Sequence, residues 1–183
     1  MPIVNHQFRL AARPVGLPKR SDWNFTQETV RELSDGELLI KILHISLDPA
    51  MRGWMNEGKS YVPPVEIGQV MRAGAVGKVV SSKNPKFAAG DTVLSMFGVQ
   101  EYAISDGKGL TKVDARLAPL PTYLATLGMP GMTAYFGLLD ICEPKAGDTV
   151  VVSAAAGAVG SVVGQIAKIH GCRAIGIAGG VLK

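Results

Sequence analysis

The stretch Thr149–Ala178, TVVVSAAAGAVGSVVGQIAKIHGCRAIGIA, decides the fold of this chain. It begins with a β-branched run, Thr149–Val152, that can be buried on both faces as an inner strand of a parallel sheet. An A-x-G-x-x-G loop follows, and the apolar spacing predicts a helix over about Ala158–His170. Arg173–Ala178 supplies a second strand. A strand, a glycine-rich turn, a helix and a strand in this order are typical of the start of a dinucleotide-binding unit.

The glycine-rich loop has residue types suited to a pyrophosphate. Ala155 replaces the first glycine of the fingerprint, and Gly157 lets the backbone approach the ligand closely. Gly160 and Gly164 are expected to let the helix pack against the strand. Free N–H groups and the dipole at the start of the helix favour phosphate. The alternative is tight helix–strand packing without a ligand. The candidate loop ligands are Ala156, Gly157, Ala158, Val159 and Gly160.

The residues after the second strand bear on the choice of dinucleotide. An acidic residue there would bond the 2′-hydroxyl of NAD, but the chain reads AGGVLK and ends in Lys183. Lys183 could pair with the 2′-phosphate of NADP, or it could be a solvated lysine. Its position alone leaves both interpretations open.

Composition narrows the class of protein. The chain has 183 residues, of which 47% are hydrophobic and 22 are glycine, as in a globular α/β or β-rich protein. Its net charge of +4 is scattered, with no basic stripe interleaved with aromatic residues, so we expect no nucleic-acid partner. The N-terminal sequence is not that of a signal peptide, and no apolar run reaches membrane-spanning length. We therefore expect a cytoplasmic protein that does not bind membranes.

The cysteines and histidines predict no metal site. Cys142 and Cys172 form no C-x-x-C motif, and the three histidines are scattered. We expect two reduced thiols packed inside the protein. The two tryptophans, Trp23 and Trp54, are expected to be packing anchors.

The chain divides into a β-rich part and a helical part, with the boundary near residue 122. Short strands separated by turn signals suggest a small barrel or sandwich in the first part. They are Leu38–Ile45, Ala75–Val80, Asp91–Leu94 and Gln100–Ile104. We therefore expect one domain over residues 1–122 and another over residues 123–183.

The second part begins with helical patterns. Thr122–Leu127 is predicted to form a short helix, and Pro130 suits the start of a second one that reaches about Cys142. The apolar residues expected to form the stripe of this second helix are Met132, Tyr135, Phe136 and Leu139.

Four motifs, in this order along the chain, carry a resemblance to a known family. They are SLDPAMRG at 46–53, YVPP at 61–64, LGMPGMTAY at 127–135 and AAAGAVG at 154–160. On these motifs the chain resembles the medium-chain dehydrogenase/reductase superfamily, and within it the zinc-independent branch of prostaglandin reductases, 2-alkenal reductases and bacterial curcumin reductase. The resemblance implies a β-rich, GroES-like, partly open barrel as the catalytic domain, followed by the truncated start of an α/β Rossmann domain.

The resemblance also implies the reaction. These enzymes use NADPH to reduce the carbon–carbon double bond of α,β-unsaturated ketones and aldehydes. Hydride goes to the β-carbon, and the enolate that results needs a hydrogen-bond donor and a proton. Where zinc-dependent relatives carry a metal-binding cysteine this chain has Ser46-Leu47-Asp48, so no metal is implied.

The resemblance assigns roles to individual residues. Tyr61 aligns with an active-site tyrosine, although it could also be packed in a proline-rich loop. Met51 and Arg52 are expected in the substrate pocket, but Arg52 could instead hold its loop through a salt bridge to Asp48. Ala50 stands where the family often has tyrosine, which could enlarge that pocket.

The cofactor assignments extend to both ends of the second part. Met129 and Thr133 lie in the motif that lines the nicotinamide side, with core packing as the alternative for Met129. Gly180 and Lys183 keep the family's spacing for a lysine that binds the 2′-phosphate, although Val181-Leu182 between them departs from its usual polar pair. The cofactor implied is therefore NADP(H).

Two other functions stay open at this stage. A neighbouring branch with the same architecture reduces quinones, and a truncated, non-catalytic domain is a third possibility. Because the family's chains are nearly twice as long, we expect this chain to be a fragment that binds NADPH weakly and turns over poorly. In full length, we expect a homodimer.

Overall fold

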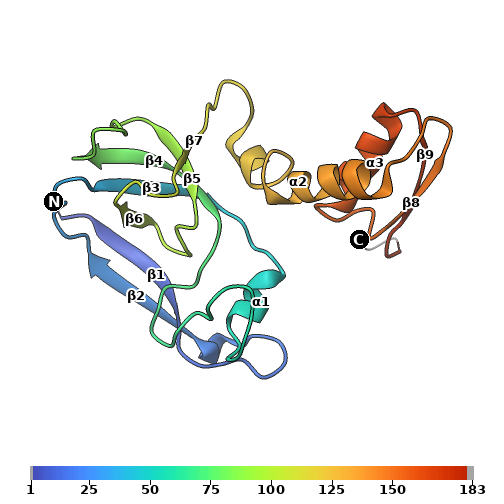
Figure 1. Cartoon of the computed structure of the whole chain (residues 1–183). Coiled ribbons are helices and arrows are strands. Elements are labelled where there is room, and N and C mark those ends of the chain that lie inside the picture. Colours follow the sequence, from blue (N-terminus) through green and yellow to red (C-terminus); the bar gives the residue numbers. More distant parts are fainter. Residues whose placement is uncertain (1, 181–183) are drawn as a thin grey trace. The chain divides into compact units, whose positions relative to one another are not determined.

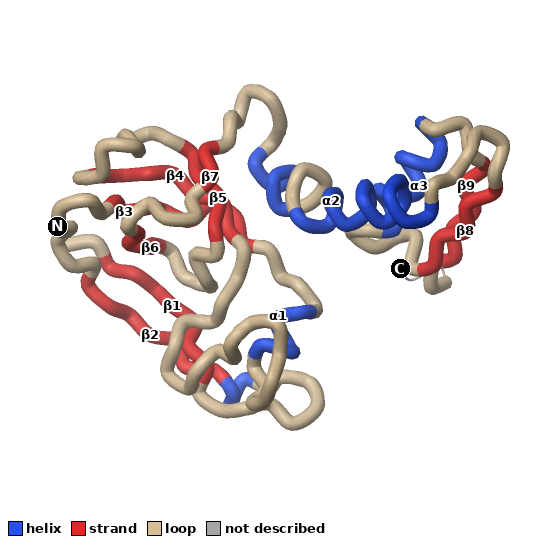
Figure 2. Tube along the Cα trace, viewed as in Figure 1, coloured by secondary structure: helices blue, strands red, loops and turns tan. Residues whose placement is uncertain are grey.

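The computed structural model describes residues 2–180, and the chain forms two compact units. The first unit is Met1–Leu120, and the second begins at Pro121. The first unit consists mainly of strands and loops, whereas the second contains two longer helices and a pair of strands (Figure 2).

Antiparallel strands dominate the first unit (Figure 1). They are β1 (Val4–Leu10), β2 (Trp23–Thr29), β3 (Leu38–Ile45), β4 (Ala75–Ser82), β5 (Thr92–Ser95), β6 (Tyr102–Ser105) and β7 (Thr111–Lys112), with the short helix α1 (Ala50–Trp54) after β3. Five of them form one sheet in the order β6-β3-β4-β5-β7, and β1 pairs with β2. Isolated bridges join β1 to residues outside the strands, Gln7 to Gln100 just before β6 and Arg9 to Val70 before β4. The result is the predicted β-rich, partly open barrel.

Two apolar clusters fill the barrel unit. The first lies among the strands of the five-stranded sheet and includes Leu38, Ile40 and Val93, all fully buried. The second lies around α1 and includes Leu10, Met71 and the largely buried Trp54. Trp54 therefore has the packing role that its size suggested.

A 3₁₀ turn at Leu120–Leu124 leads into the second unit, where the sequence predicted a short helix over Thr122–Leu127. Helix α2 (Met129–Phe136) follows and continues as a π-helical turn over Gly137–Cys142. Pro130 lies in its first turn, as predicted.

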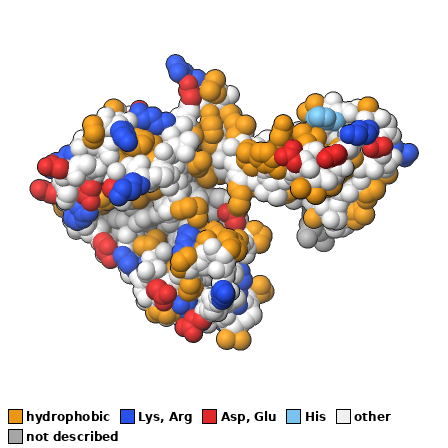
Figure 3. Space-filling view, in the orientation of Figure 1, with side chains coloured by type: hydrophobic (Ala, Val, Ile, Leu, Met, Phe, Trp, Pro, Cys, Tyr) orange, Lys and Arg blue, Asp and Glu red, His pale blue; other side chains and the backbone are white. Residues whose placement is uncertain are grey.

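The predicted apolar stripe of this helix is wrong for three of its four residues, whereas Leu139 is partly buried against the core of this unit. The residues that α2 and the π-helical turn bury are Gly131, Ala134 and Leu138. Met132, Tyr135 and Phe136 are about half exposed, and hydrophobic side chains are visible along α2 in Figure 3. Small residues bring the helix backbone close to its neighbours and leave the bulky side chains outside.

The predicted strand–loop–helix–strand unit is present. Strands β8 (Thr149–Ser153) and β9 (Arg173–Ile177) are parallel, and helix α3 (Gly160–Ile169) connects them. The helix begins at Gly160, two residues later than predicted, because Ala158 and Val159 belong to the turn before it.

The small core of this unit joins α3 to its neighbours. It consists of Leu138, Ala167 and Cys172, with partly buried residues around them. Cys172 is packed as expected, but Cys142 is exposed, so the prediction of two packed thiols is half wrong. None of the helices within residues 2–180 is long and apolar enough to cross a bilayer.

Candidate functional site

The loop between β8 and α3 turns sharply around the carbonyl oxygen of Ala154. The Gly157 N–H donates to this oxygen over 2.8 Å, and Ala154 itself has φ +50°, in the left-handed region. The next residue, Ala155, donates its N–H to the Ile177 carbonyl of β9 over 3.0 Å. The left-handed residue that a glycine would normally supply is therefore Ala154, one position before the alanine that replaces the fingerprint glycine.

The start of α3 presents unused backbone donors. The N–H groups of Ala158, Val159 and Gly160 have no acceptor within the described part of the chain. They lie where the helix dipole is positive, which favours an anionic group. A Cβ on Gly160 would lie 2.4 Å from the Ala154 oxygen, so only glycine fits there. Gly164 has open space around its α-carbon, so the packing role predicted for it is wrong.

A cavity of about 500 Å³ adjoins this loop in the second unit. It brings Thr133 from α2 together with Gly157, Val159 and Gly160. The Thr133 hydroxyl donates to the Met129 carbonyl over 2.8 Å, while the Met129 side chain is exposed and not packed in a core. The lining therefore combines a helical threonine with the loop that the sequence assigned to the cofactor.

Of the other predicted cofactor residues, Met129, Ala156, Ala158 and Gly180 do not line this cavity. Ala156 and Ala158 are exposed in the loop, and Gly180 is exposed beyond β9. Lys183 lies outside the described residues.

The first unit contains a second cavity, of about 510 Å³. Its floor is made by three chain segments that meet through their backbones. The Phe8 N–H donates to the Val99 carbonyl, the Val99 N–H to the Met71 carbonyl, and the Met71 N–H to the Phe8 carbonyl, over 2.9, 2.8 and 2.8 Å. Sheet pairing therefore brings together residues that are far apart in the sequence.

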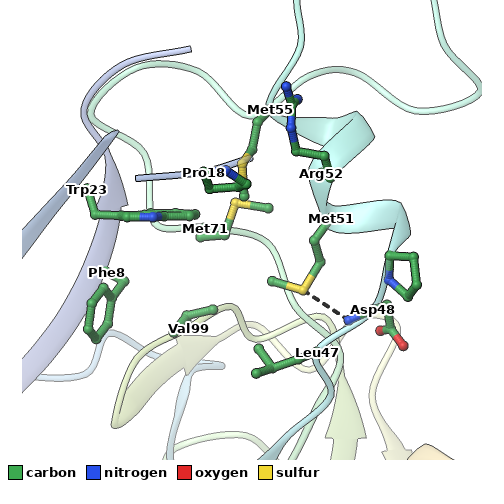
Figure 4. Close-up of a pocket in the computed structure, with 11 residues that line it drawn as sticks. Phe8, Pro18, Trp23, Leu47, Asp48, Met51, Arg52, Met55, Met71 and Val99 are labelled. Atoms are coloured by element: carbon green, nitrogen blue, oxygen red, sulfur yellow. Dashed lines mark hydrogen bonds between the residues drawn. The ribbon is translucent and has the colours of Figure 1, made fainter. Parts of the chain in front are cut away.

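The walls of this cavity are mostly apolar and rich in sulfur. In Figure 4, the side chains of Met55 and Met71 lie between Trp23 and α1. Met51 also faces the cavity, and its sulfur accepts a hydrogen bond from the Asp48 N–H over 3.3 Å. Methionine side chains adapt their shape to apolar ligands, so this cavity can hold an apolar molecule.

Arg52 lines the cavity but does not pair with Asp48, so that alternative is wrong. Its guanidinium donates to the carbonyls of Gly16 and Pro14, each over 2.8 Å, and to the Asn56 side chain over 2.5 Å. Asp48 instead accepts from the Ser46 hydroxyl over 3.0 Å. Arg52 therefore fixes the loop before β2 against α1.

Tyr61 lies in the loop between α1 and β4 and is 79% exposed. It is not packed in that loop, and it is not among the residues that line the first-unit cavity. Its hydroxyl oxygen accepts a hydrogen bond from the indole N–H of Trp54 over 3.2 Å.

The sequence analysis missed several residues of the first-unit cavity. Phe8 and Val99 contact it because β1 pairs with the segment before β6, and nothing in the sequence around either residue signals that pairing. A methionine signal was present in MRGWM at 51–55. Met55 directly follows α1 and lies one helical turn after Met51, so the two side chains are on the same side of the chain.

A barrel with an apolar cavity, followed by a strand, a glycine-rich loop and a helix, defines a class of two-part, dinucleotide-binding proteins. The chain belongs to the family described as the N-terminal domain of oxidoreductase, whose model matches residues 6–113. It belongs to the branch of the medium-chain dehydrogenase/reductase superfamily that contains the curcumin, prostaglandin and 2-alkenal reductases. Residues 2–180 contain no cluster of three histidine, cysteine or acidic side chains that could hold a metal ion.

Individual relatives cover nearly the whole chain. It is 46% identical over 98% of its length to the NADPH-dependent curcumin reductase of Escherichia coli (strain K12), and 47% identical over 90% to prostaglandin reductase 1 of Bos taurus. The crystal structure of CurA in complex with NADPH from Vibrio vulnificus superposes on 96% of the chain with a TM-score of 0.89 and 49% identity. In each case the chain spans about half the length of the relative, at 52%, 49% and 52%.

Proposed function

We propose that the whole protein reduces the carbon–carbon double bond of α,β-unsaturated ketones and aldehydes with NADPH. The observation that carries this proposal is the geometry at the start of α3, where Gly160 lies against the Ala154 carbonyl and the N–H groups beside it are unused within the described residues. The relatives named NADPH-dependent curcumin reductase and 2-alkenal reductase support the choice of cofactor and substrate class.

The loop and the second-unit cavity fit a dinucleotide. The N–H groups of Ala158, Val159 and Gly160 would hold the pyrophosphate, and the cavity beside Thr133 would take part of the nicotinamide half. When bound, NADPH supplies the hydride that reduces the substrate's β-carbon. We assign Met129 and Gly180 to the same cofactor, and Lys183 to its 2′-phosphate.

The first unit would supply the groups that act on the substrate. The methionine-lined cavity beside Met51 and Arg52 would receive its apolar part. The Tyr61 hydroxyl would donate a hydrogen bond to the carbonyl oxygen as negative charge develops there, and would then give up its proton.

Assigning the substrate groups to the first part of the chain and the cofactor groups to the second also defines a domain boundary. We propose a catalytic domain over residues 1–122 and the beginning of a cofactor domain over residues 123–183. The contacts within the chain support a boundary nearby, because they separate Met1–Leu120 from the chain that begins at Pro121.

The deciding experiment measures NADPH oxidation by the whole protein with enones, alkenals and quinones, and identifies the products. The proposal predicts a saturated ketone or aldehyde, with kcat reduced by about 100-fold or more in Tyr61→Phe. Hydroquinone as the main product would contradict it. A parallel titration of NADPH into the 183-residue chain tests the expected weak binding by this piece alone.

A further inference from the structure

The loop that carries Tyr61 is held at both ends. The Val65 N–H donates to the Trp54 carbonyl over 2.8 Å, which returns the chain to the end of α1. The Arg13 guanidinium donates to the carbonyl of Met55 over 2.9 Å and also to that of Val65. The loop therefore starts and ends at fixed points, although Tyr61 itself is exposed.

Between these points, the Tyr61 hydroxyl has one defined partner. The indole N–H of Trp54 donates to its oxygen over 3.2 Å, and Trp54 is only 8% exposed. An indole nitrogen can only donate, so the tyrosine oxygen must accept in this bond. The hydroxyl proton of Tyr61 therefore points away from Trp54 and stays available for another acceptor.

Arg72 fixes the indole in turn. Its guanidinium carbon lies 5.5 Å from the centre of the Trp54 ring, and its Nη1–H donates to the Pro63 carbonyl over 2.9 Å. The cation over the ring and the hydrogen bond to the loop act together on the same segment. The largely buried Trp54 therefore contacts Arg72 through its ring and the exposed Tyr61 hydroxyl through its N–H.

From this geometry we infer that Trp54 is a positioning residue that orients the Tyr61 hydroxyl as a proton donor to the substrate, with Arg72 holding the indole in place. This inference rests on the proposed function. In the step concerned, the O–H bond of Tyr61 breaks and its proton passes to the enolate. The electron pair stays on the tyrosine oxygen, where the indole N–H stabilises it, and water restores the proton.

The orientation of the Tyr61 hydroxyl by Trp54 can be tested without measuring enzyme activity. In ¹⁵N-labelled 183-residue chain, the two tryptophans give two indole N–H signals, and Trp54→Phe identifies which belongs to Trp54. Tyr61→Phe removes the acceptor, so the Trp54 signal should move upfield while that of Trp23 stays in place. If the Trp54 signal does not move in Tyr61→Phe, the inference is overturned.

The role in the reaction needs the whole protein and a double-mutant cycle. Trp54→Phe keeps most of the packing and removes the N–H, so kcat should fall by roughly tenfold with KM for NADPH unchanged. In a Tyr61→Phe background the same change should have no further effect, because the two residues act as one unit. An equal loss of kcat in both backgrounds would show a merely structural role and would overturn the inference.

Arg72→Gln provides a second variant in which both aromatic residues remain. It should shift the Trp54 signal and lower kcat by a smaller factor than Trp54→Phe does. A wild-type protein that reduces no enone would refute the proposed function and this catalytic role with it, whereas the indole signals would still report whether Trp54 and Tyr61 are paired.

Discussion

The side-chain amide of Asn5 donates a hydrogen bond of 3.0 Å to the side-chain carbonyl of Gln100, 95 residues further along the chain. Gln7 donates to the same oxygen over 2.9 Å, and both donors are almost completely buried. Gln100 in turn donates to the Phe97 carbonyl over 2.6 Å. A polar network therefore attaches β1 to the segment that leads into β6.

Removing the shared acceptor should be costly. Gln100→Ala removes the acceptor of the buried Gln7 amide, whereas the Asn5 amide keeps its hydrogen bond of 2.9 Å to the Tyr102 carbonyl. We therefore expect the free energy of unfolding to fall by about 1–3 kcal/mol. Urea denaturation of the barrel unit measures this. The matched control is Gln165→Ala, which removes an exposed amide on α3 and should change stability by less than about 0.5 kcal/mol. Similar effects of the two substitutions would refute a structural role of the network.

The glycines of the α3 segment should respond in opposite ways to alanine. Gly160→Ala places a Cβ against the Ala154 carbonyl, so it should destabilise the second unit by about 1–3 kcal/mol and weaken NADPH binding. Gly164→Ala meets no other atom and should stabilise the helix by about 0.5–1 kcal/mol. Thermal unfolding and NADPH titration of both variants separate these outcomes. Equal NADPH affinities in the two variants would contradict a tight turn at Gly160.

The contacts of Arg52 predict that Arg52 contributes to folding stability and that the charge of Asp48 does not. Arg52→Ala frees the carbonyls of Pro14 and Gly16, so we expect a loss of about 1–3 kcal/mol in unfolding free energy. Asp48→Asn keeps an acceptor for the Ser46 hydroxyl and should change stability by less than about 0.5 kcal/mol. A large effect of Asp48→Asn in urea titrations would instead point to a charge pair between the two residues.

One ion pair should make stability depend on pH in the acidic range. Arg31 donates two hydrogen bonds of 2.7 Å to the Glu37 carboxylate and lowers the pKa of this group from 4.5 to about 2. A pKa that is lower in the folded state adds stability above pH 4.5, and this contribution is lost as the pH falls towards 2. The stability difference between wild type and Glu37→Gln should therefore shrink over that range. It should also shrink in 1 M NaCl, because exposed charges are screened, and a difference insensitive to both would count against the pair.

The sequence predicted those elements of the fold that can be recognised from the apolar residues within their own segment. Leu38–Ile45 was located correctly, and the unit from β8 to β9 within two residues, because buried strands and helices carry their signal in their own residues. Strands β1 and β2 were missed for a physical reason. In β1 the buried residues include Asn5 and Gln7, whereas Phe8 is exposed, so the usual alternation is inverted.

The candidate site also has one part that the sequence could predict and another that it could not. The loop around Gly157 and Gly160 could be predicted because the fingerprint is contiguous in sequence. The first-unit cavity depends on the backbone contact between Phe8 and Val99, and the bond from Trp54 to Tyr61 depends on how a long loop folds back. Such contacts between distant segments leave no periodic trace in the sequence.

The left-handed backbone at Ala154 sets folding stability against ligand binding. An L-residue in this conformation costs about 1–2 kcal/mol, which glycine would largely avoid. Ala154→Gly should therefore raise the melting temperature of the second unit. The same change allows the turn more conformations, so the amides at the start of α3 should bind phosphate less tightly in an NADPH titration. Ala154 would then lower the thermal stability of the second unit and, in return, keep the binding loop ordered before its ligand arrives.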